Sequence, residues 1–147
     1  MELLAGDIGG TNTRLAIFNT ADGASFDSVR EQTYPSRGFQ SLEEILRVFL
    51  QDAPAGIERA CFGIAGPIIE QTCDATNLPW RISAAAIGAA FGLRHCRLLN
   101  DLEANAWGIQ ALTEHDFHSL NPGQPGRIGN ASIISAGTGL GEAGLYW

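Results

Sequence analysis

Short apolar stretches separated by turn residues fill the first part of the chain, and this pattern predicts strands rather than helices. Residues 3–5 and 15–18 are apolar and flank a Gly-Gly turn, so they predict two strands joined as a hairpin. A second turn signal at residues 20–23 separates this hairpin from a third strand, which is expected over residues 25–34. The chain is therefore expected to begin with three consecutive antiparallel strands.

The spacing of apolar residues then changes to that of an amphipathic helix. Over residues 42–50 the apolar side chains fall at i, i+3, i+4, i+7 and i+8, which places them on one face of a helix. Ser41 and Glu44 stand at the N-cap and N3 positions of a capping box. The short apolar run over residues 57–65 that follows is typical of a buried parallel strand.

The rest of the chain continues this alternation of helices and strands. Further helices are expected over 84–91 and 102–112, and further strands over 96–99, 131–136 and 143–147. Residues 68–80 are irregular and are expected to hold a small excursion, whereas the Pro/Gly-rich residues 121–130 indicate a hinge. The order βββαβαβα predicts an α/β fold with a mixed sheet and helices packed on its faces.

Composition and charge narrow the possible partners. The chain has 147 residues, about one domain in length, with sixteen acidic and nine basic residues and a net charge of −7. This charge argues against nucleic acids and anionic membranes as partners, and no leader or membrane-spanning apolar run is recognised. Three cysteines without a CxxC pair are typical of reduced thiols, which predicts a cytoplasmic protein.

The first Gly-Gly turn carries more polar groups than a hairpin turn requires. Asp7 precedes the pair Gly9-Gly10, and Thr11 follows it. Because glycine lacks a Cβ atom, a ligand can come within hydrogen-bonding distance of the backbone N–H groups. An aspartate at a strand end can hold a hydrated Mg²⁺ ion, and a threonine can donate to a phosphate oxygen. The turn therefore predicts a phosphate site, with a plain surface hairpin as the alternative.

Two further polar clusters follow predicted strands. They are Asn100-Asp101 and the turn Gly137-Thr138-Gly139. Ligands of open α/β sheets bind at the carboxyl ends of the strands, so these clusters and the first turn can meet in one cleft. For Asp101 the alternative is an N-cap of the next helix, a position that aspartate favours, and the two roles are compatible.

One arginine and two tryptophans each have two possible roles, and one phosphate-binding motif is excluded. Arg14 can pair with a phosphate or form a surface salt bridge within its strand. Trp80 and Trp107 are expected in the core or in a cleft wall. All nine basic residues are arginines, so a Walker A loop, which needs a lysine after its glycine, is excluded.

Taken together, the motifs resemble the bacterial glucokinase family, which has the hexokinase, Hsp70 and actin-like ATPase fold. The similar segments, in order along the chain, are DIGGTNTR, IAGP, TNLPW, LLNDLEANAWG and SAGTGLG. The resemblance implies a ribonuclease H-like (actin-like ATPase) domain. It also implies a small N-terminal lobe over residues 1–112, and a hinge with the first hairpin of a truncated large lobe over 113–147.

The resemblance also implies a role for each motif. The residues that match the two phosphate loops of the family are Asp7, Gly9, Gly10 and Thr11, and Gly137, Thr138 and Gly139. These loops bind ATP, and Asp7 would hold Mg²⁺ through water. Asn100 and Asp101 match the sugar-binding pair, with Asp101 as the catalytic base, and Asn77 lies in a loop that resembles the sugar-side wall.

The activity implied by the resemblance is that of a glucokinase, which transfers a phosphoryl group from ATP to glucose in the first step of glycolysis. A non-catalytic sugar- or nucleotide-binding module of the same fold is the alternative. Because the family's second lobe supplies part of each binding site, we expect this chain alone to be inactive and to bind glucose and ATP weakly. An unpaired strand edge near residues 131–147 would favour a homodimer.

Overall fold

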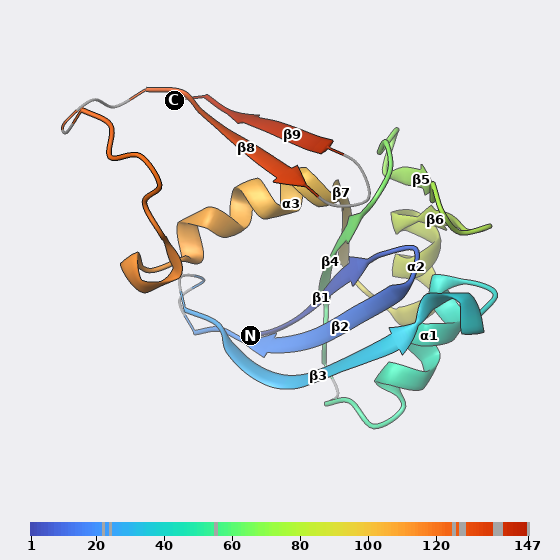
Figure 1. Cartoon of the computed structure of the whole chain (residues 1–147). Helices are drawn as coiled ribbons and strands as arrows, with labels where there is room; N and C mark the ends of the chain where they lie inside the picture. The colour runs from blue at the N-terminus through green and yellow to red at the C-terminus, as the bar shows by residue number, and fades with distance from the viewer. Residues whose placement is uncertain are drawn as a thin grey trace. The chain divides into compact units, whose positions relative to one another are not determined.

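The structure is a computed structural model that describes residues 1–21, 23, 25–54, 56–124, 126, 129–136 and 140–146. The chain divides into two compact units, Met1–Asp101 and Leu102–Trp147 (Figure 1). The first unit contains a five-stranded sheet and a small two-stranded sheet, and the second contains one two-stranded sheet.

The five-stranded sheet is mixed, as the sequence predicts. Its strands are β1 (Glu2–Ile8), β2 (Asn12–Asn19), β3 (Asp27–Pro35), β4 (Arg59–Ile64) and β7 (His95–Asn100). They lie in the order β3-β2-β1-β4-β7 (Figure 1). Strand β2 runs antiparallel to both β1 and β3, and β4 and β7 continue the sheet parallel to β1.

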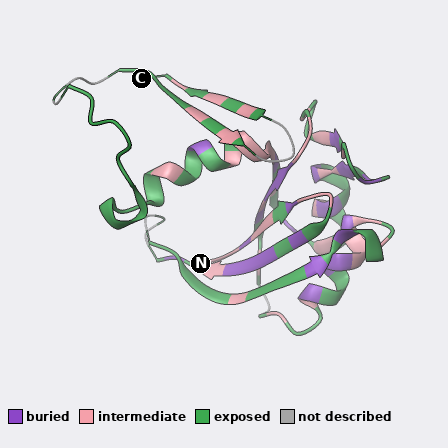
Figure 2. Cartoon of the chain, in the orientation of Figure 1, coloured by how far each residue is buried: buried purple, intermediate pink, exposed green. Residues whose placement is uncertain are grey.

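Helices α1 (Leu42–Leu50) and α2 (Ala84–Phe91) pack on one face of this sheet (Figure 1). Both crossovers, from β3 to β4 and from β4 to β7, run in the same direction across the sheet. Right-handed connections therefore place both helices on the same side. One hydrophobic core joins side chains of both helices to Leu4, Leu15 and Phe62 of the sheet, and buried positions concentrate in these elements (Figure 2).

Local capping explains why these helices begin and end where they do. The Ser41 hydroxyl accepts the N–H of Glu44 at 3.4 Å, as the capping box predicts. The Glu44 carboxylate accepts the N–H of Gln40 at 2.7 Å, one residue before the N-cap, so the box closes differently from the usual pattern. Ser83 caps α2, and Gly92 ends it at φ +68°, in the left-handed region that glycine favours.

The irregular segment after β4 contains a hairpin that the predicted order lacks. Its strands are β5 (Thr72–Asp74) and β6 (Arg81–Ser83), and they form a separate antiparallel sheet. The hairpin is inserted between β4 and α2. Trp80 precedes β6, is buried, and donates its indole N–H to the Phe39 carbonyl at 3.3 Å. Of its two expected positions, the core and a cleft wall, Trp80 takes the core.

The second unit holds one helix and one hairpin among its described residues. Helix α3 (Asp101–Gly108) begins at the unit boundary and is followed by two 3₁₀ turns, Ile109–Ala111 and Glu114–Asp116. Strands β8 (Ala131–Ala136) and β9 (Leu140–Leu145) pair antiparallel, and β9 begins earlier than expected. Within the ranges described above, no helix is both long and apolar enough to span a membrane.

Candidate functional site

Three parallel strands bring the predicted polar residues to the same end of the sheet. Asp7, near the end of β1, lies opposite Gly63 of β4, which in turn lies opposite Leu99 of β7. Asp101 follows Leu99 by two residues and is the first residue of α3. The carboxyl ends of these strands thus carry Asp7 and the pair Asn100-Asp101, as expected for a ligand site in an α/β sheet.

Burial and neighbouring charges change the acidity of the Asp7 carboxyl group. Asp7 is partly exposed to solvent. The surrounding protein nevertheless desolvates its carboxyl group in part, and this desolvation raises the Asp7 pKa above its usual value. The negative charge of Asp101 raises the Asp7 pKa further, whereas the positive charge of Arg14 lowers it. Asp7 and Asp101 therefore lie within electrostatic range of each other.

The glycine turn after β1 is tight and lies against the loop that contains Asn77. The Gly9 N–H donates to the Asn12 carbonyl at 3.0 Å. A Cβ atom added at Gly10 would lie 2.5 Å from the Asn77 Cβ, so only glycine fits there. The structure thus brings together Gly10 and Asn77, which belong to separate motifs in the sequence.

A buried hydroxyl pair holds the glycine turn, and the sequence did not reveal its role. Ser36 donates its hydroxyl proton to the Gly9 carbonyl at 2.7 Å, and its oxygen lies 2.9 Å from the Thr13 hydroxyl oxygen. Because the single hydroxyl proton of Ser36 is already donated to Gly9, Thr13 is the donor in the hydrogen bond between the two hydroxyl groups. The Ser36 N–H also donates to the Thr11 carbonyl at 2.9 Å. Thr13 and Ser36 are fully buried, and they fix the backbone of the turn from the core side.

The loop that follows β4 is hydrogen bonded both to Asn100 and to the residue before Asn77. The Asn100 side chain donates an N–H to the Gly66 carbonyl at 3.0 Å. Thr76, the residue before Asn77, donates its hydroxyl proton to the carbonyl of Ala65 at 3.1 Å, and Ala65 precedes Gly66 in the chain. This loop therefore fixes both the orientation of the Asn100 amide and the start of the segment that contains Asn77.

Arg14 forms the surface salt bridge that is one of its two predicted roles. Its Nη2 atom lies 2.6 Å from Glu31 Oε1 on the adjacent strand, and its Nε donates to the same oxygen at 2.7 Å. Both side chains are exposed, so the pair lies at the surface. The predicted second phosphate loop, Gly137, Thr138 and Gly139, lies outside the described residues, and only the flanking strands β8 and β9 are described.

Comparison with known proteins identifies the family. The model of the family described as glucokinase matches residues 4–147. The chain belongs to the glucokinase family. It is 41% identical to the glucokinase of Nostoc punctiforme over 97% of its own length and 42% of that protein. This glucokinase-family chain thus spans about two fifths of the length of the curated relative.

Solved structures agree with the family in fold. The crystal structure of glucokinase from an Antarctic psychrotroph matches 99% of this chain and 46% of that chain, with a TM-score of 0.86 and 33% identity. A ROK family glucokinase from Streptomyces griseus, solved in complex with glucose and AMPPNP, matches 99% of this chain and 45% of that chain. Its TM-score is 0.64 and its identity 22%, which shows the fold alone.

The donor set of the glucokinase-family chain suits a hydrated Mg²⁺ ion. Mg²⁺ is usually bound by one or two carboxylates together with waters and phosphate oxygens. Asp7 and Asp101 supply two carboxylates whose mutual repulsion a cation would relieve. Among the described residues, no group of three or more His, Cys, Asp or Glu side chains could hold a metal ion, so an all-protein cage is not the kind of site present.

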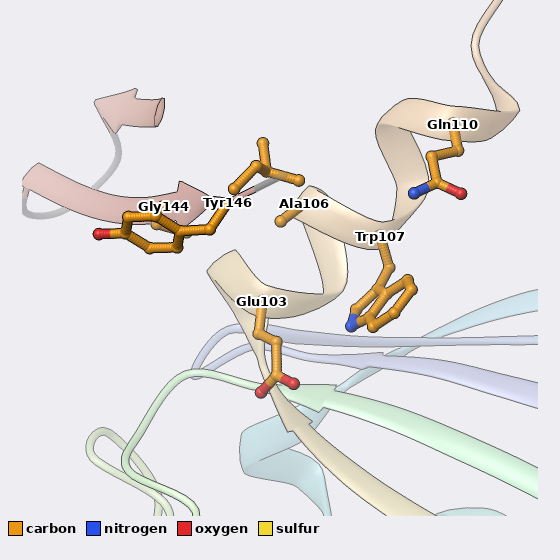
Figure 3. A pocket seen from close by; sticks show the side chains of 8 residues that line it. Glu103, Ala106, Trp107, Gln110, Gly144 and Tyr146 are labelled. Atoms are coloured by element: carbon orange, nitrogen blue, oxygen red, sulfur yellow. The ribbon is translucent and has the colours of Figure 1, made fainter. Parts of the chain in front are cut away.

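A separate pocket of about 350 Å³ lies within the second unit (Figure 3). Its lining includes Trp107 of α3 and Tyr146, which follows β9, and Figure 3 shows Ala106 between these two aromatic side chains. Trp107 is 64% exposed, so it lines this pocket instead of joining a core. Glu103 is the charged residue of the lining, which therefore offers no cation to a phosphate group.

Proposed function

We propose that the protein to which this chain belongs transfers the γ-phosphoryl group of ATP to glucose and forms glucose 6-phosphate. The observation that carries the proposal is the meeting of a tight glycine turn, Asn77 and two interacting carboxylates at one end of the sheet. Membership of the glucokinase family supports glucose as the substrate. The complex of the Streptomyces griseus protein with glucose and AMPPNP supports ATP as the donor.

The proposed domain organisation has two lobes. Residues 1–112 form a small lobe with the ribonuclease H-like (actin-like ATPase) fold, and residues 113–147 form a hinge and the first hairpin of a truncated large lobe. The sheet order β3-β2-β1-β4-β7 supports the first assignment, because antiparallel leading strands followed by parallel crossovers are its pattern. The hairpin of β8 and β9 supports the second.

Two loops would bind the nucleotide. The proposed residues are Asp7, Gly9, Gly10 and Thr11 in the first loop, and Gly137, Thr138 and Gly139 in the second. Open backbone N–H groups at glycines can surround phosphate oxygens. Mg²⁺, held by Asp7 through water, would neutralise charge on the transferred phosphoryl group. The hydrogen bonds from Ser36 to the first loop support a turn that is shaped before ATP binds.

The sugar would lie against Asn77, Asn100 and Asp101. Phosphoryl transfer depends mostly on positioning and electrostatic stabilisation. In our proposal Asp101 accepts the proton of the 6-hydroxyl, and general-base catalysis of this kind contributes about 10²–10⁴-fold. The Asn100 amide can both donate to and accept from sugar hydroxyls, and its hydrogen bond to Gly66 supports a fixed orientation.

The proposal also includes the cellular compartment and the oligomeric state of the protein. We place the protein in the cytoplasm, which the absence of any pattern of paired cysteines in the sequence supports. A homodimer also remains part of the proposal. In the sheet of β8 and β9 each strand has only one partner among the described residues, and such edges favour pairing with another chain.

The proposal is tested with the full-length protein that carries this chain. Incubation with glucose, ATP and Mg²⁺ should yield glucose 6-phosphate and ADP in equal amounts, measured by chromatography. Glucose binding without any phosphorylated product would instead support the alternative, a non-catalytic sugar-binding module of the same fold.

A further inference from the structure

A tight turn between β4 and β5 is built from two residues that rarely adopt its conformation. Glu70 and Gln71 have φ values of +49° and +57°, both in the left-handed region. On either side of them, Ile69 and Thr72 exchange two backbone hydrogen bonds of 2.9 Å. This is a two-residue hairpin turn of the kind that asparagine and glycine favour. Such strain persists only where the surroundings compensate for it, and it gathers at functional sites.

The Gln71 side chain supplies that compensation by contacting the backbone of β7. Its Oε1 accepts the N–H of Leu98 at 2.8 Å, and its Nε2 donates to the Leu98 carbonyl at 3.4 Å. Strand β7 is an edge strand, and the Gln71 amide pairs with it much as one residue of a further strand would. The Gln71 carbonyl also accepts the N–H of Ala84, the first residue of α2, at 3.0 Å.

These contacts lie next to the candidate sugar site. Leu98 precedes Asn100 by two residues and Asp101 by three. Asn100 is itself hydrogen bonded to Gly66, which belongs to the same loop as the turn. The last residues of β7 are therefore held by β4 on one side and by this loop on the other.

We infer that Gln71 is a positioning residue, which fixes the end of β7 and through it the sugar-side pair Asn100 and Asp101. The inference rests on the proposed function, because it assigns a purpose to the placement of that pair. Gln71 acts through the backbone of β7, which its side chain contacts at Leu98.

The test compares Gln71→Gly with the matched control Glu70→Gly in the full-length protein. Glycine adopts both left-handed conformations without strain, so each variant keeps the turn. Only Gln71→Gly removes the contacts with Leu98. Hydrogen exchange of the Leu98 amide, followed by NMR, should become about tenfold faster in Gln71→Gly and stay unchanged in Glu70→Gly. The side-chain amide signal of Asn100 should shift in Gln71→Gly alone.

Kinetics then separate positioning from a merely structural role. Gln71→Gly should raise the KM for glucose by about tenfold, since small misplacements of binding groups are costly, and leave the KM for ATP unchanged. Gln71→Glu keeps an acceptor for the Leu98 N–H and should recover part of this loss. Unchanged exchange at Leu98, or an unchanged KM for glucose in an active enzyme, would overturn the inference. A parent protein without kinase activity would refute the proposed function, and the Leu98 and Asn100 signals would still decide whether Gln71 holds β7.

Discussion

Asp7 and Asp101 lie at one end of the sheet, and the charge of Asp101 acts on the Asp7 carboxyl group. The pKa of Asp7 lies above its usual value because of burial and the charge of Asp101. Between the usual and the raised pKa the folded chain binds more protons at Asp7 than the unfolded chain does. The Asp7 contribution to stability therefore decreases as the pH rises through that window. A phosphate-bound cation near Asp7 would remove this cost.

We predict opposite effects on Asp7 from two substitutions. Asp101→Asn removes a like charge and should lower the Asp7 pKa, whereas Arg14→Gln removes an opposite charge and should raise it. NMR titration of the Asp7 carboxyl carbon measures both shifts. An Asp7 pKa that does not respond to Asp101→Asn would show that the two carboxylates do not share a site.

At the scale of elements, the sheet and the helices on its face depend on one apolar core. Phe49 of α1 is fully buried. Its ring meets Tyr34 of β3 edge to face, with ring centroids 6.4 Å apart, and the Arg30 guanidinium lies 5.0 Å from its centroid. Helix α1 is therefore fixed to β3 as well as to the central strands.

We expect Phe49→Ala to lower the free energy of unfolding by about 3–5 kcal/mol, because it leaves a cavity in the core. Val48→Ala is the matched control: it shortens the neighbouring side chain on the same helix, at a position that is 47% exposed. That control should change stability by less than about 1 kcal/mol. Denaturant unfolding measures both, and equal effects would contradict the packing of α1 described here.

Elements specified by local signals could be predicted from the sequence, whereas elements specified by distant partners could not. Ser41 and Ser83 cap their helices by accepting the N–H of a residue three positions further along the chain. Such short spacings are visible in the sequence, so both helix starts could be predicted. The contact of Gln71 with Leu98 spans 27 residues, and that of Thr13 with Ser36 spans 23. No local rule identifies such pairs. The three-residue strands β5 and β6 were missed because they are too short to show a period.

The same distinction applies to the candidate site. The glycine turn and the Asn100-Asp101 pair follow predicted strands, and their meeting at one end of the sheet could be inferred from the topology. The contact between Gly10 and Asn77 could not, because it depends on how the loop before β6 folds back. The roles of Asp7, Asn77 and Asp101 themselves remain predictions.

At the scale of the whole molecule, the acidic charge of the chain affects the nucleotide binding that we propose. With a net charge of −7, the chain has no general attraction for ATP. Arg14, the arginine of the first phosphate motif, is paired with Glu31. In our proposal, nucleotide binding at the turn after β1 would therefore rely on backbone N–H groups and Mg²⁺.

The length of the relatives predicts weak binding by this chain alone. It spans 42% of the Nostoc punctiforme glucokinase, and in our proposal a second lobe completes the sugar site. Isothermal titration with glucose should show no sub-millimolar affinity for the chain, whereas the full-length protein should bind. Equal affinity in the two proteins would show that the sugar site lies entirely within residues 1–147.

The most direct test of the account is the turnover of Asp101→Asn in the full-length protein, with Glu103→Gln as the matched control. Loss of the base should lower kcat by about 10²–10⁴-fold, while glucose binding, followed by isothermal titration, is retained. Glu103→Gln, which changes a carboxylate two residues further along α3, should turn over glucose normally. Undiminished turnover in Asp101→Asn would contradict the proposed role of Asp101 as the base in sugar phosphorylation.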